Sequence, residues 1–249
     1  MIIQVIGLPG SGKTTFSKEL SERINAIHLN ADEVRQDLNS DLGFNKEDRV
    51  EQARRMGALS RLLSNQDQIV IADFVCPTFE TRKAFGKPDI LVWVDRIKES
   101  RFEDTNIMWE SPLYWDMKIE FGSTVEDSIY EFIDLFGFTD WKRPTTLMLG
   151  RYQPWHEGHD ALHSEAEKRT KQVVVGVRNT SGTSVKDPLS FGQVKEGIHK
   201  YRDDAFIMKM PNITNIVYGR DVGYLIEKVE LPEHIQAISA TEKRKQMGL

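Results

Sequence analysis

Short apolar runs alternate with segments of helical periodicity along most of the chain. Ile2–Ile6 is an apolar run of strand length, a glycine-rich turn follows it, and Thr14–Ile24 then repeats apolar residues at helical spacing. A second opening of this kind comes much later, with Thr146–Leu149, a loop over Gly150–Glu157 and a helical stretch from about Gly158. Each is typical of the start of a β-strand–α-helix unit, so we expect an α/β fold.

Further apolar runs predict buried parallel strands in both halves of the chain. They cover Ile69–Ala72, Ile90–Val94, Val173–Val177, Ala205–Met210 and Ile216–Tyr218. Between the halves, Ser128–Phe136 has helical spacing, and the stretch 137–144 that follows carries Gly, Asp and Pro, as linkers do. We therefore expect two domains, residues 1–143 and 144–249.

Composition narrows the class of protein. The 249 residues include 39% hydrophobic and 29% charged residues, a globular mix, and 33 Lys and Arg against 38 Asp and Glu give a net charge of −5. This acidic balance makes nucleic acid an unexpected partner. The apolar runs are far shorter than the roughly 20 residues of a membrane helix, and no secretion signal is recognisable. With one cysteine, these features favour a cytoplasmic protein without a membrane segment.

The first glycine-rich turn carries a phosphate-binding motif. Gly7-Leu8-Pro9-Gly10-Ser11-Gly12-Lys13-Thr14 fits the pattern G-x-x-x-x-G-K-S/T at every fixed position, between a strand and a helix. Such a loop turns backbone N–H groups toward a triphosphate, so we expect ATP and Mg²⁺ as cofactors. Lys13 would reach the β- and γ-phosphates, and the hydroxyl of Thr14 would bind Mg²⁺. The candidate nucleotide-binding residues are Gly7, Gly10, Ser11, Gly12, Lys13, Thr14 and Thr15.

Two carboxylates follow at predicted strand ends. Asp32 could accept a proton from an attacking hydroxyl or hold Mg²⁺ through water, while Arg35 could bind an anionic part of the acceptor. Asp32 could instead cap a helix. Asp73 ends the run Ile69–Ala72, where a second Mg²⁺-linked acid is expected, although a helix-capping role is also open.

These residues, with several others, make the first half resemble adenylylsulfate kinase, which phosphorylates the 3′-hydroxyl of adenylyl sulfate with ATP. The resemblance covers most of residues 1–100. It rests on the phosphate loop, Asp32-Glu33-Val34-Arg35, residues 39–44, Asp48-Arg49-Val50-Glu51, Arg54-Arg55, Phe74-Val75-Cys76-Pro77 and Thr81-Arg82. It implies that Phe44 packs on the acceptor's adenine, that Arg35 and Arg49 hold its phosphosulfate, and that Asp32 is the catalytic base or metal-linked acid beside a catalytic Lys13.

The chain departs from this family at three places. The family's Asp-Gly-Asp-Asn is Asn30-Ala31-Asp32-Glu33 here, and its Ser before Pro is Cys76, which we interpret as a packed thiol at the substrate side. The lid region is the shorter, more polar stretch 96–106. Within it, Arg96, Lys98 and Arg101 could close over the phosphates or form a solvated helix face, and Phe102 is a further candidate substrate-binding residue.

Other acceptors remain open for the kinase. A polynucleotide 5′-kinase also combines a phosphate loop with an Asn-x-Asp-x-x-Arg-like segment, although the acidic chain counts against it. A different nucleotide conjugate is a further alternative, including one made by the second domain. The resemblance also implies that the kinase domain could form a homodimer.

A second chemical motif opens the second half. Gly150-Arg151-Tyr152-Gln153-Pro154-Trp155-His156-Glu157-Gly158-His159 places two histidines three residues apart where a helix begins. Two imidazole donors at a helix N-terminus can stabilise charge that develops on a phosphate under attack. Metal binding and plain packing are the other interpretations. Near the other end of this half, Ser239, Thr241 and Arg244 could bind β- and γ-phosphates at the start of the last helix.

With both motifs, residues 145–249 resemble the His-x-Gly-His nucleotidyltransferases, notably nicotinamide-mononucleotide adenylyltransferases and small cytidylyltransferases. This resemblance implies catalytic roles for His156 and His159 and triphosphate binding by Ser239, Thr241 and Arg244. The stretches 179–188 and 218–221 are candidate acceptor-side and nucleotide-side loops. ATP sulfurylase, a relative, is disfavoured because its Arg-Asn-Pro is replaced by Gln153-Pro154-Trp155.

The sequence thus predicts a bifunctional enzyme acting on small nucleotides. Its fold would be a P-loop NTPase-type parallel-sheet domain followed by a small Rossmann-like nucleotidyltransferase domain. The alternative from another class is that one domain is only a nucleotide-binding or assembly module.

Overall fold

The computed structural model describes residues 1–180, 184, 186–217, 219–220, 223 and 225–248. The chain divides into two compact units, Met1–Lys142 and Arg143–Leu249. The strands of the first unit are β1 (Ile2–Ile6), β2 (Ile27–Asn30), β3 (Val70–Asp73), β4 (Ile90–Asp95) and β5 (Met117–Glu120). Its helices are α1 (Lys13–Ile24), α2 (Ala31–Asp37), α3 (Lys46–Ser64), α4 (Phe79–Phe85), α5 (Glu103–Met108) and α6 (Val125–Phe136).

The first unit is built on one parallel sheet with the strand order β2-β3-β1-β4-β5. The central strand β1 has β3 on one side and β4 on the other, and its five residues are all buried. Because the strands are parallel, their carboxyl ends meet at one edge of the sheet. The phosphate loop after β1, Asn30 at the end of β2 and Asp73 at the end of β3 therefore meet there.

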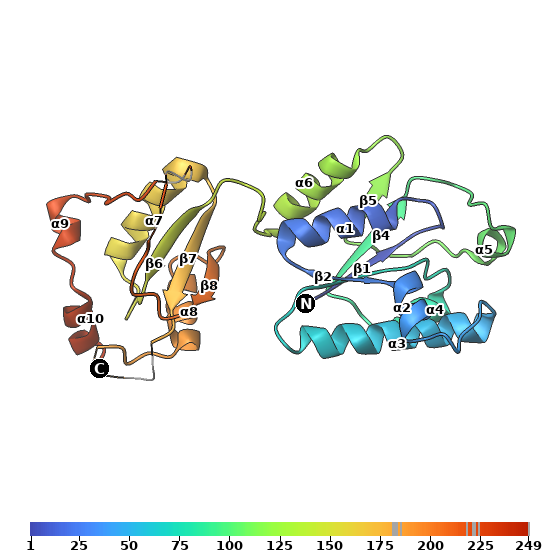
Figure 1. Cartoon of the computed structure of the whole chain (residues 1–249), viewed down its shortest axis with the longest axis horizontal. Coiled ribbons are helices and arrows are strands. Elements are labelled where there is room, and N and C mark those ends of the chain that lie inside the picture. Colours follow the sequence, from blue (N-terminus) through green and yellow to red (C-terminus); the bar gives the residue numbers. More distant parts are fainter. Residues whose placement is uncertain (181–183, 185, 218, 221–222, 224, 249) are drawn as a thin grey trace. The chain divides into compact units, whose positions relative to one another are not determined.

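Helices cover both faces of this sheet, as the alternation of side chains along β1 requires (Figure 1). Ile3 and Val5 belong to the core that α1 and α6 close, where the rings of Phe16 and Phe132 meet edge to face with centroids 6.1 Å apart. Ile2 faces the opposite core, which α2, α3 and α4 complete. The sheet is thus fixed from both sides, so its carboxyl edge is a rigid base for the loops.

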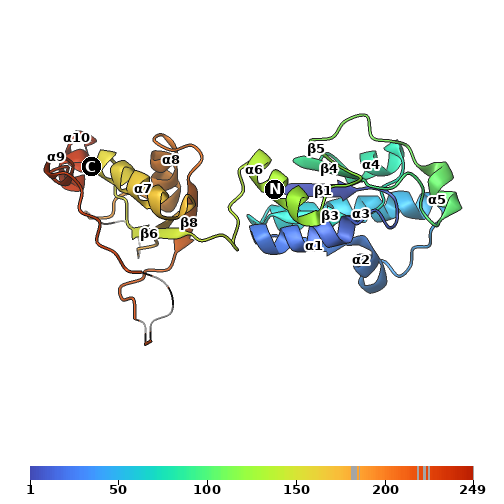
Figure 2. The ribbon, with the colours of Figure 1, turned by 90° about the horizontal axis from the view of Figure 1, so that it is seen from above.

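The second unit has a smaller parallel sheet, and its elements are β6 (Thr146–Gly150), α7 (Glu157–Thr170), β7 (Val173–Arg178), α8 (Phe191–His199), β8 (Phe206–Met210), α9 (Glu233–Gln236) and α10 (Ala240–Gln246). Its strand order is β6-β7-β8. Figure 2 shows α7 and α8 on one face of this sheet. There Val175 and Val177 of β7 pack with Val194 and Ile198 of α8.

The predicted strands at Ile69–Ala72, Ile90–Val94, Val173–Val177 and Ala205–Met210 form, with bounds that differ by one residue at most. The strand predicted over Ile216–Tyr218 is wrong for its two described residues. Residues 211–217 have no strand structure, and Tyr218 lies outside the described residues. Ile216 and Val217 are 57% and 88% exposed. An apolar run forms a buried strand only where a neighbouring surface packs against it, and these two side chains are mostly exposed.

None of the helices in the described part of the chain combines the length and the apolar character needed to cross a bilayer.

Candidate functional site

The phosphate loop takes the shape that its sequence predicts. Gly12 is the N-cap of α1 and has a φ of 95°, a left-handed conformation that suits glycine. Gly7 has no room for a side chain, because a Cβ there would lie 2.4 Å from the carbonyl oxygen of Val94 on β4. The loop therefore packs closely against β4 and leads directly into the first turn of α1.

Lys13 is buried at the base of this loop. Its Nζ donates to the carbonyl oxygen of Leu8 at 2.9 Å. Burial lowers the pKa of Lys13 to about 8, although Asp73 and then Asp32 act in the opposite direction. The ammonium group of Lys13 is buried and donates to one backbone carbonyl. Binding of a phosphate to it is therefore favourable, because the anion would restore the charge stabilisation that burial removes.

Asp73 is the centre of a polar cluster at the end of β3. Thr14 Oγ1 donates to Asp73 Oδ2 at 2.7 Å, and the side-chain amide of Asn30 donates to Oδ1 at 3.1 Å. His28 on β2 places its Nε2 2.6 Å from the same Oδ1. Asp73 does not cap a helix. The N-cap of α4 is Thr78, so the helix-capping alternative for Asp73 is wrong.

The helix-capping alternative for Asp32 is also wrong. The N-cap of α2 is Asn30, whose side-chain oxygen accepts from the backbone N–H groups of Asp32 and Glu33 at 3.0 and 3.2 Å. Asp32 itself lies in the first turn of α2 with an exposed side chain. Asn30 thus orients α2 with its oxygen and holds Asp73 with its nitrogen.

A cavity of about 530 Å³ opens beside the phosphate loop. Of the residues predicted from the sequence, it is lined by Gly10, Lys13, Thr14, Asp32, Phe44, Arg49, Asp73, Arg101 and Phe102. Arg35, a predicted substrate-binding residue, is not among the lining residues, but it contacts Phe44, which is. Phe44 is 65% exposed, and its ring has the guanidinium of Arg35 4.7 Å from its centroid and that of Arg49 at 5.9 Å. Burial, and then the charge of Arg49, lower the pKa of Arg35. Phe44 and Arg49 therefore offer an exposed ring and a cation to a ligand in the cavity, with Asp104 as the present partner of Arg49.

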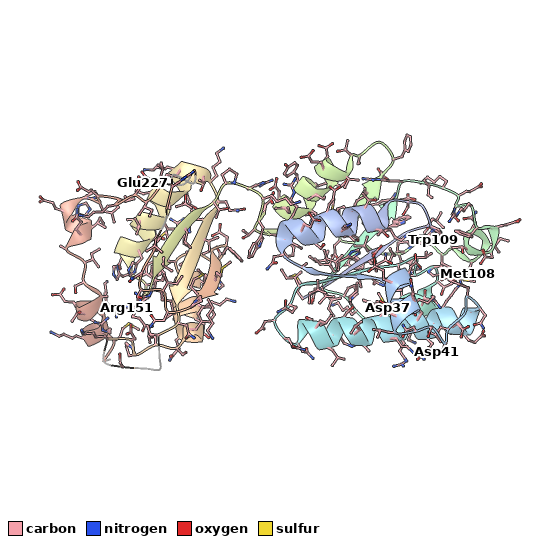
Figure 3. All side chains as sticks on the ribbon, in the orientation of Figure 1. Asp37, Asp41, Met108, Trp109, Arg151 and Glu227 are labelled. Atoms are coloured by element: carbon pink, nitrogen blue, oxygen red, sulfur yellow. The ribbon has the colours of Figure 1, made fainter. Side chains whose placement is uncertain are left out.

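Cys76 does not line this cavity. It is 1% exposed, and its Sγ lies 3.5 Å from Nε2 of Gln4 on β1, in a cluster with Ile6, Trp93 and Trp109. Trp109 follows α5 and is labelled in Figure 3. Burial raises the pKa of the Cys76 thiol to about 12, so the thiol stays protonated and packed.

The stretch 96–106 is partly ordered by its own contacts. Ser100 Oγ donates to Oδ1 of Asn106 at 2.7 Å, and Arg49 reaches Asp104 at 2.9 Å, which ties the start of α5 to α3. The guanidinium of Arg101 covers the ring of Phe102, with 4.8 Å between its Cζ and the ring centroid. Lys98 is exposed and pairs with Asp95, whereas Arg96 packs on the phosphate loop near Gly12.

In the second unit, the two histidines of the motif lie in direct contact. The rings of His156 and His159 stack with centroids 3.8 Å apart. His156 is the N-cap of α7, and its Nδ1 accepts from the backbone N–H of Gly158 at 3.1 Å, which leaves Nε2 as a proton donor. Burial and then the neighbouring His156 lower the pKa of His159 to about 3. The pair is therefore neutral near pH 7.

The predicted phosphate-binding residues near the other end of this unit lie beside the loop that carries the two histidines. Arg244 donates to the carbonyl oxygen of Gln153 at 2.6 Å and to Thr241 Oγ1 at 3.0 Å. Lys243 pairs with Glu157 at 3.1 Å, and Ser239 caps α10 by accepting from the N–H of Thr241. On the other side of the loop, Arg151, labelled in Figure 3, pairs with Asp187 at 3.2 Å.

Two of the predicted loops fall partly outside the described residues. In the stretch 179–188, residues 181–183 and 185 are not described, and in the stretch 218–221 the same holds for Tyr218 and Asp221. Among the described residues, no group of three or more His, Cys, Asp and Glu side chains is arranged to hold a metal ion.

His28 is among the residues of the first site that were missed in the sequence, as are Asp104 and Thr105, which line the cavity. His28 lies in an apolar strand pattern, and its partner Asp73 is 45 positions away. The alternation along β2 could have found it, because His28 and Asn30 are two residues apart and so share a face of the strand.

Comparison with known proteins finds relatives of the first unit. The family model of adenylylsulphate kinase matches residues 1–89, which lie wholly within the first unit. An adenylyl-sulfate kinase of Clostridium kluyveri is 38% identical over 104 residues, which are 38% of this chain and 52% of that protein. An adenylyl-sulfate kinase of Staphylococcus carnosus is 41% identical over 87 residues, 33% of this chain and 44% of that protein.

The chain thus spans about half the length of the curated relatives it matches. Among solved structures, the APS kinase of Mycobacterium tuberculosis in complex with AMPPNP and APS has a TM-score of 0.49 and 22% identity, over 54% of this chain and 96% of that chain.

Proposed function

We propose that the first unit is an ATP-dependent phosphotransferase whose acceptor is the 3′-hydroxyl of adenylyl sulfate. The observation that carries this proposal is the convergence of Lys13, Thr14 and Asp73 on a cavity that is also lined by the exposed ring of Phe44 and by Arg49. A phosphate donor binds at one side of such a cavity, and an adenine ring with an anionic group fits the other. The sequence similarity of residues 1–89 to adenylylsulphate kinases supports the same acceptor.

The residues at the end of β3 fit a magnesium ion. Thr14 donates its proton to Asp73 and accepts from the side-chain amide of Asn30 at 3.2 Å, so one lone pair of its hydroxyl stays available for a cation, and the carboxylate of Asp73 lies beside it. Thr14 would be a direct ligand and Asp73 would bind through water. When bound, Mg²⁺ would neutralise charge on the donor phosphates.

The transfer itself needs one proton acceptor and charge neutralisation. The acceptor's hydroxyl oxygen forms a bond to the γ-phosphorus, the bond from that phosphorus to the β–γ bridging oxygen breaks, and ADP leaves with the bonding electrons. Asp32 lines the cavity with an exposed carboxylate and takes the hydroxyl proton. Lys13 neutralises the phosphate during the transfer.

The test is incubation of the full chain with Mg-ATP and adenylyl sulfate, with chromatography of the 3′-phosphorylated product. Lys13→Ala should abolish the product, while Lys18→Ala, an exposed lysine on the same helix, should not. Phe44→Ala should raise the KM for adenylyl sulfate and leave that for ATP unchanged. If the protein binds ATP but forms no product, the assignment of adenylyl sulfate as the acceptor is wrong. Assays of a 5′-hydroxyl oligonucleotide and of products of the second unit would then decide between the alternatives.

For the second unit, we propose nucleotidyl transfer from a nucleoside triphosphate to a phosphate acceptor. The specific support is the contact of Arg244 with Gln153, which brings the far-end hydroxyls of Ser239 and Thr241 to the stacked pair His156 and His159. His156 Nε2 would donate to the α-phosphate, and Ser239, Thr241 and Arg244 would bind the phosphates that leave as pyrophosphate.

Release of pyrophosphate from ATP or CTP in the presence of nicotinamide mononucleotide or a phosphorylated alcohol tests this second proposal. His159→Ala should abolish the release without affecting the kinase reaction. If no acceptor gives pyrophosphate, the second unit is a binding or assembly module.

A further inference from the structure

Arg96 lies against the phosphate loop, on the side of β4. It follows β4 directly, and its Nη1 is 3.3 Å from the position that a Cβ on Gly12 would take. Its neighbour Ile97 similarly flanks Gly10, at 3.9 Å from the corresponding position. This guanidinium is therefore part of the wall of the phosphate loop and is not on a distant, solvated helix face.

The positive charge of Arg96 is only weakly compensated by neighbouring protein groups. Its Nη2 donates to the hydroxyl of Ser128 on α6 at 3.3 Å, and its buried Nε has no hydrogen-bond partner. No ion pair of Arg96 occurs among the described residues. The adjacent carboxylate, Asp95, is occupied by Lys98 at 2.9 Å and Lys118 at 3.0 Å.

Its location makes this lack of a partner costly. A cation beside the N-terminus of a helix is disfavoured by the helix dipole, and Arg96 lies beside Gly12, the N-cap of α1. A buried donor without an acceptor adds a further penalty. Both penalties disappear when an anion binds between the guanidinium and the helix N-terminus, so the arrangement is completed by a ligand with negative charge.

The two sides of the phosphate loop have different partners. The cavity takes Asn30, Asp32 and Asp73 from the segments at β2 and β3, and residues 101–105 from the segment after β4 close it. Arg96 is not among its lining residues and lies at the β4 flank of the loop, across β1 from β3. In phosphoryl transfer the attacking and leaving oxygens are roughly in line with the phosphorus between them. An acceptor bound on the side of β3 therefore directs the leaving ADP toward β4.

We propose that Arg96 binds the diphosphate of the donor nucleotide on the side of the phosphate loop from which ADP leaves. This inference rests on the proposed phosphotransferase function. Arg96 would hold ADP and ATP alike, because both carry the same diphosphate, and it would neutralise charge that appears on ADP as the transferred phosphate departs. Ser128 is the residue that keeps the guanidinium in place.

Isothermal titration of the full chain with ADP and with ATP tests this assignment. Arg96→Ala should weaken both ligands by a similar factor of roughly tenfold or more, as expected for loss of a hydrogen bond to a charged group. Lys98→Ala is the matched control, because Lys98 is two positions away with the same charge and an 82% exposed side chain. The Lys98→Ala variant should bind ADP and ATP with the affinities of the wild type.

Arg96→Gln guards against misfolding, since it keeps a polar side chain that can reach Ser128 but removes the charge. It should show the same joint loss for ADP and ATP, and its thermal unfolding should match the wild type. Unchanged affinity for ADP in both variants would overturn the inference. So would a loss confined to ATP, which would place Arg96 at the transferred phosphate.

The same titration separates this inference from the proposed function. If the wild type binds neither ADP nor ATP, the proposed phosphotransferase fails and the role of Arg96 fails with it. If the wild type binds both and the variants bind equally well, only the role of Arg96 fails.

Discussion

His28 Nε2 lies 2.6 Å from Oδ1 of Asp73, the shortest contact that this buried carboxylate makes. Asp73 is 1% exposed and also accepts from Thr14 on α1 and Asn30 at the end of β2. Three segments far apart in the sequence are thereby joined through one carboxylate. The orientation of Asp73, which the proposed metal site needs, depends on His28 and Asn30 as well as on Thr14, and the phosphate-loop pattern includes only Thr14.

His28→Leu should therefore weaken binding of Mg-ATP by roughly tenfold, as is typical when a residue behind a metal ligand is lost. ATP binding in EDTA should change little, because Lys13 and the loop backbone remain. His28→Gln can restore a donor to Asp73 and should recover most of the affinity. Calorimetry with and without Mg²⁺ measures both quantities. An equal loss in EDTA would contradict a role through Asp73.

Nucleotide binding should take up protons near pH 8. The pKa of Lys13 is about 8 in the free protein because the group is buried, and a bound phosphate raises it. ATP affinity should therefore fall as the pH rises through 8. About half a proton should be taken up per nucleotide at pH 8 and almost none at pH 6.5.

Titrations in buffers of different ionisation enthalpy measure this uptake. Lys13→Arg is the control, because a guanidinium stays protonated at these pH values. Equal uptake in that variant would assign the proton to another group.

Gly57 should resist replacement although it lies inside α3. A Cβ at this position would be 2.0 Å from the carbonyl oxygen of Phe85 at the end of α4. Gly57→Ala should therefore lower the free energy of unfolding by ~1–3 kcal/mol, despite the better helix propensity of alanine. Gly197 in α8 has open space around its Cβ position, so Gly197→Ala should be neutral or stabilising by up to ~1 kcal/mol. Urea unfolding compares each variant with the wild type. If the two variants have the same free energy of unfolding relative to the wild type, α3 and α4 can move apart without loss of stability.

The second unit should lose stability in mild acid because of His159. Its folded pKa of about 3 lies below the ordinary histidine value of 6.5, so between these values the unfolded chain binds a proton that the folded chain excludes. Each pH unit below about 6.5 should then cost ~1.4 kcal/mol from this residue. His159→Asn should flatten the slope of unfolding free energy against pH, and His234→Asn, an exposed control, should keep it. An unchanged slope in His159→Asn would show that His159 is protonated in the folded state.

The parts of the fold that were predictable from the sequence depend on local signals. The run Ile2–Ile6, the glycines after it and the spacing of Phe16 and Leu20 specify strand, loop and helix without reference to distant residues. His156 could likewise be placed at the start of α7, because the loop before it and the helical periodicity after it are both local. That Asp73 ends a buried strand follows from the apolar residues just before it.

What could not be predicted depends on contacts between distant segments. Asn30 looks like a lost acid in the sequence, but in the structure it caps α2 and also donates to Asp73. Arg96 could not be told from Lys98 by position, since only the packing of β4 against the phosphate loop separates a wall residue from an exposed one. Val217 has a strand-like neighbourhood in sequence, but no surface covers it.

The burial of Cys76 has a practical consequence for spectroscopy. It is the chain's one cysteine, it is 1% exposed, and its thiol has a pKa of about 12. Thiol-specific dyes react with the thiolate of an accessible cysteine, so the native protein is almost silent toward them. A cysteine introduced at an exposed position, such as Lys98, would then be the one site that takes up a fluorophore or a spin label. The wild-type background thus allows motion of the stretch 96–106 to be followed on binding of nucleotide, without first removing a native thiol.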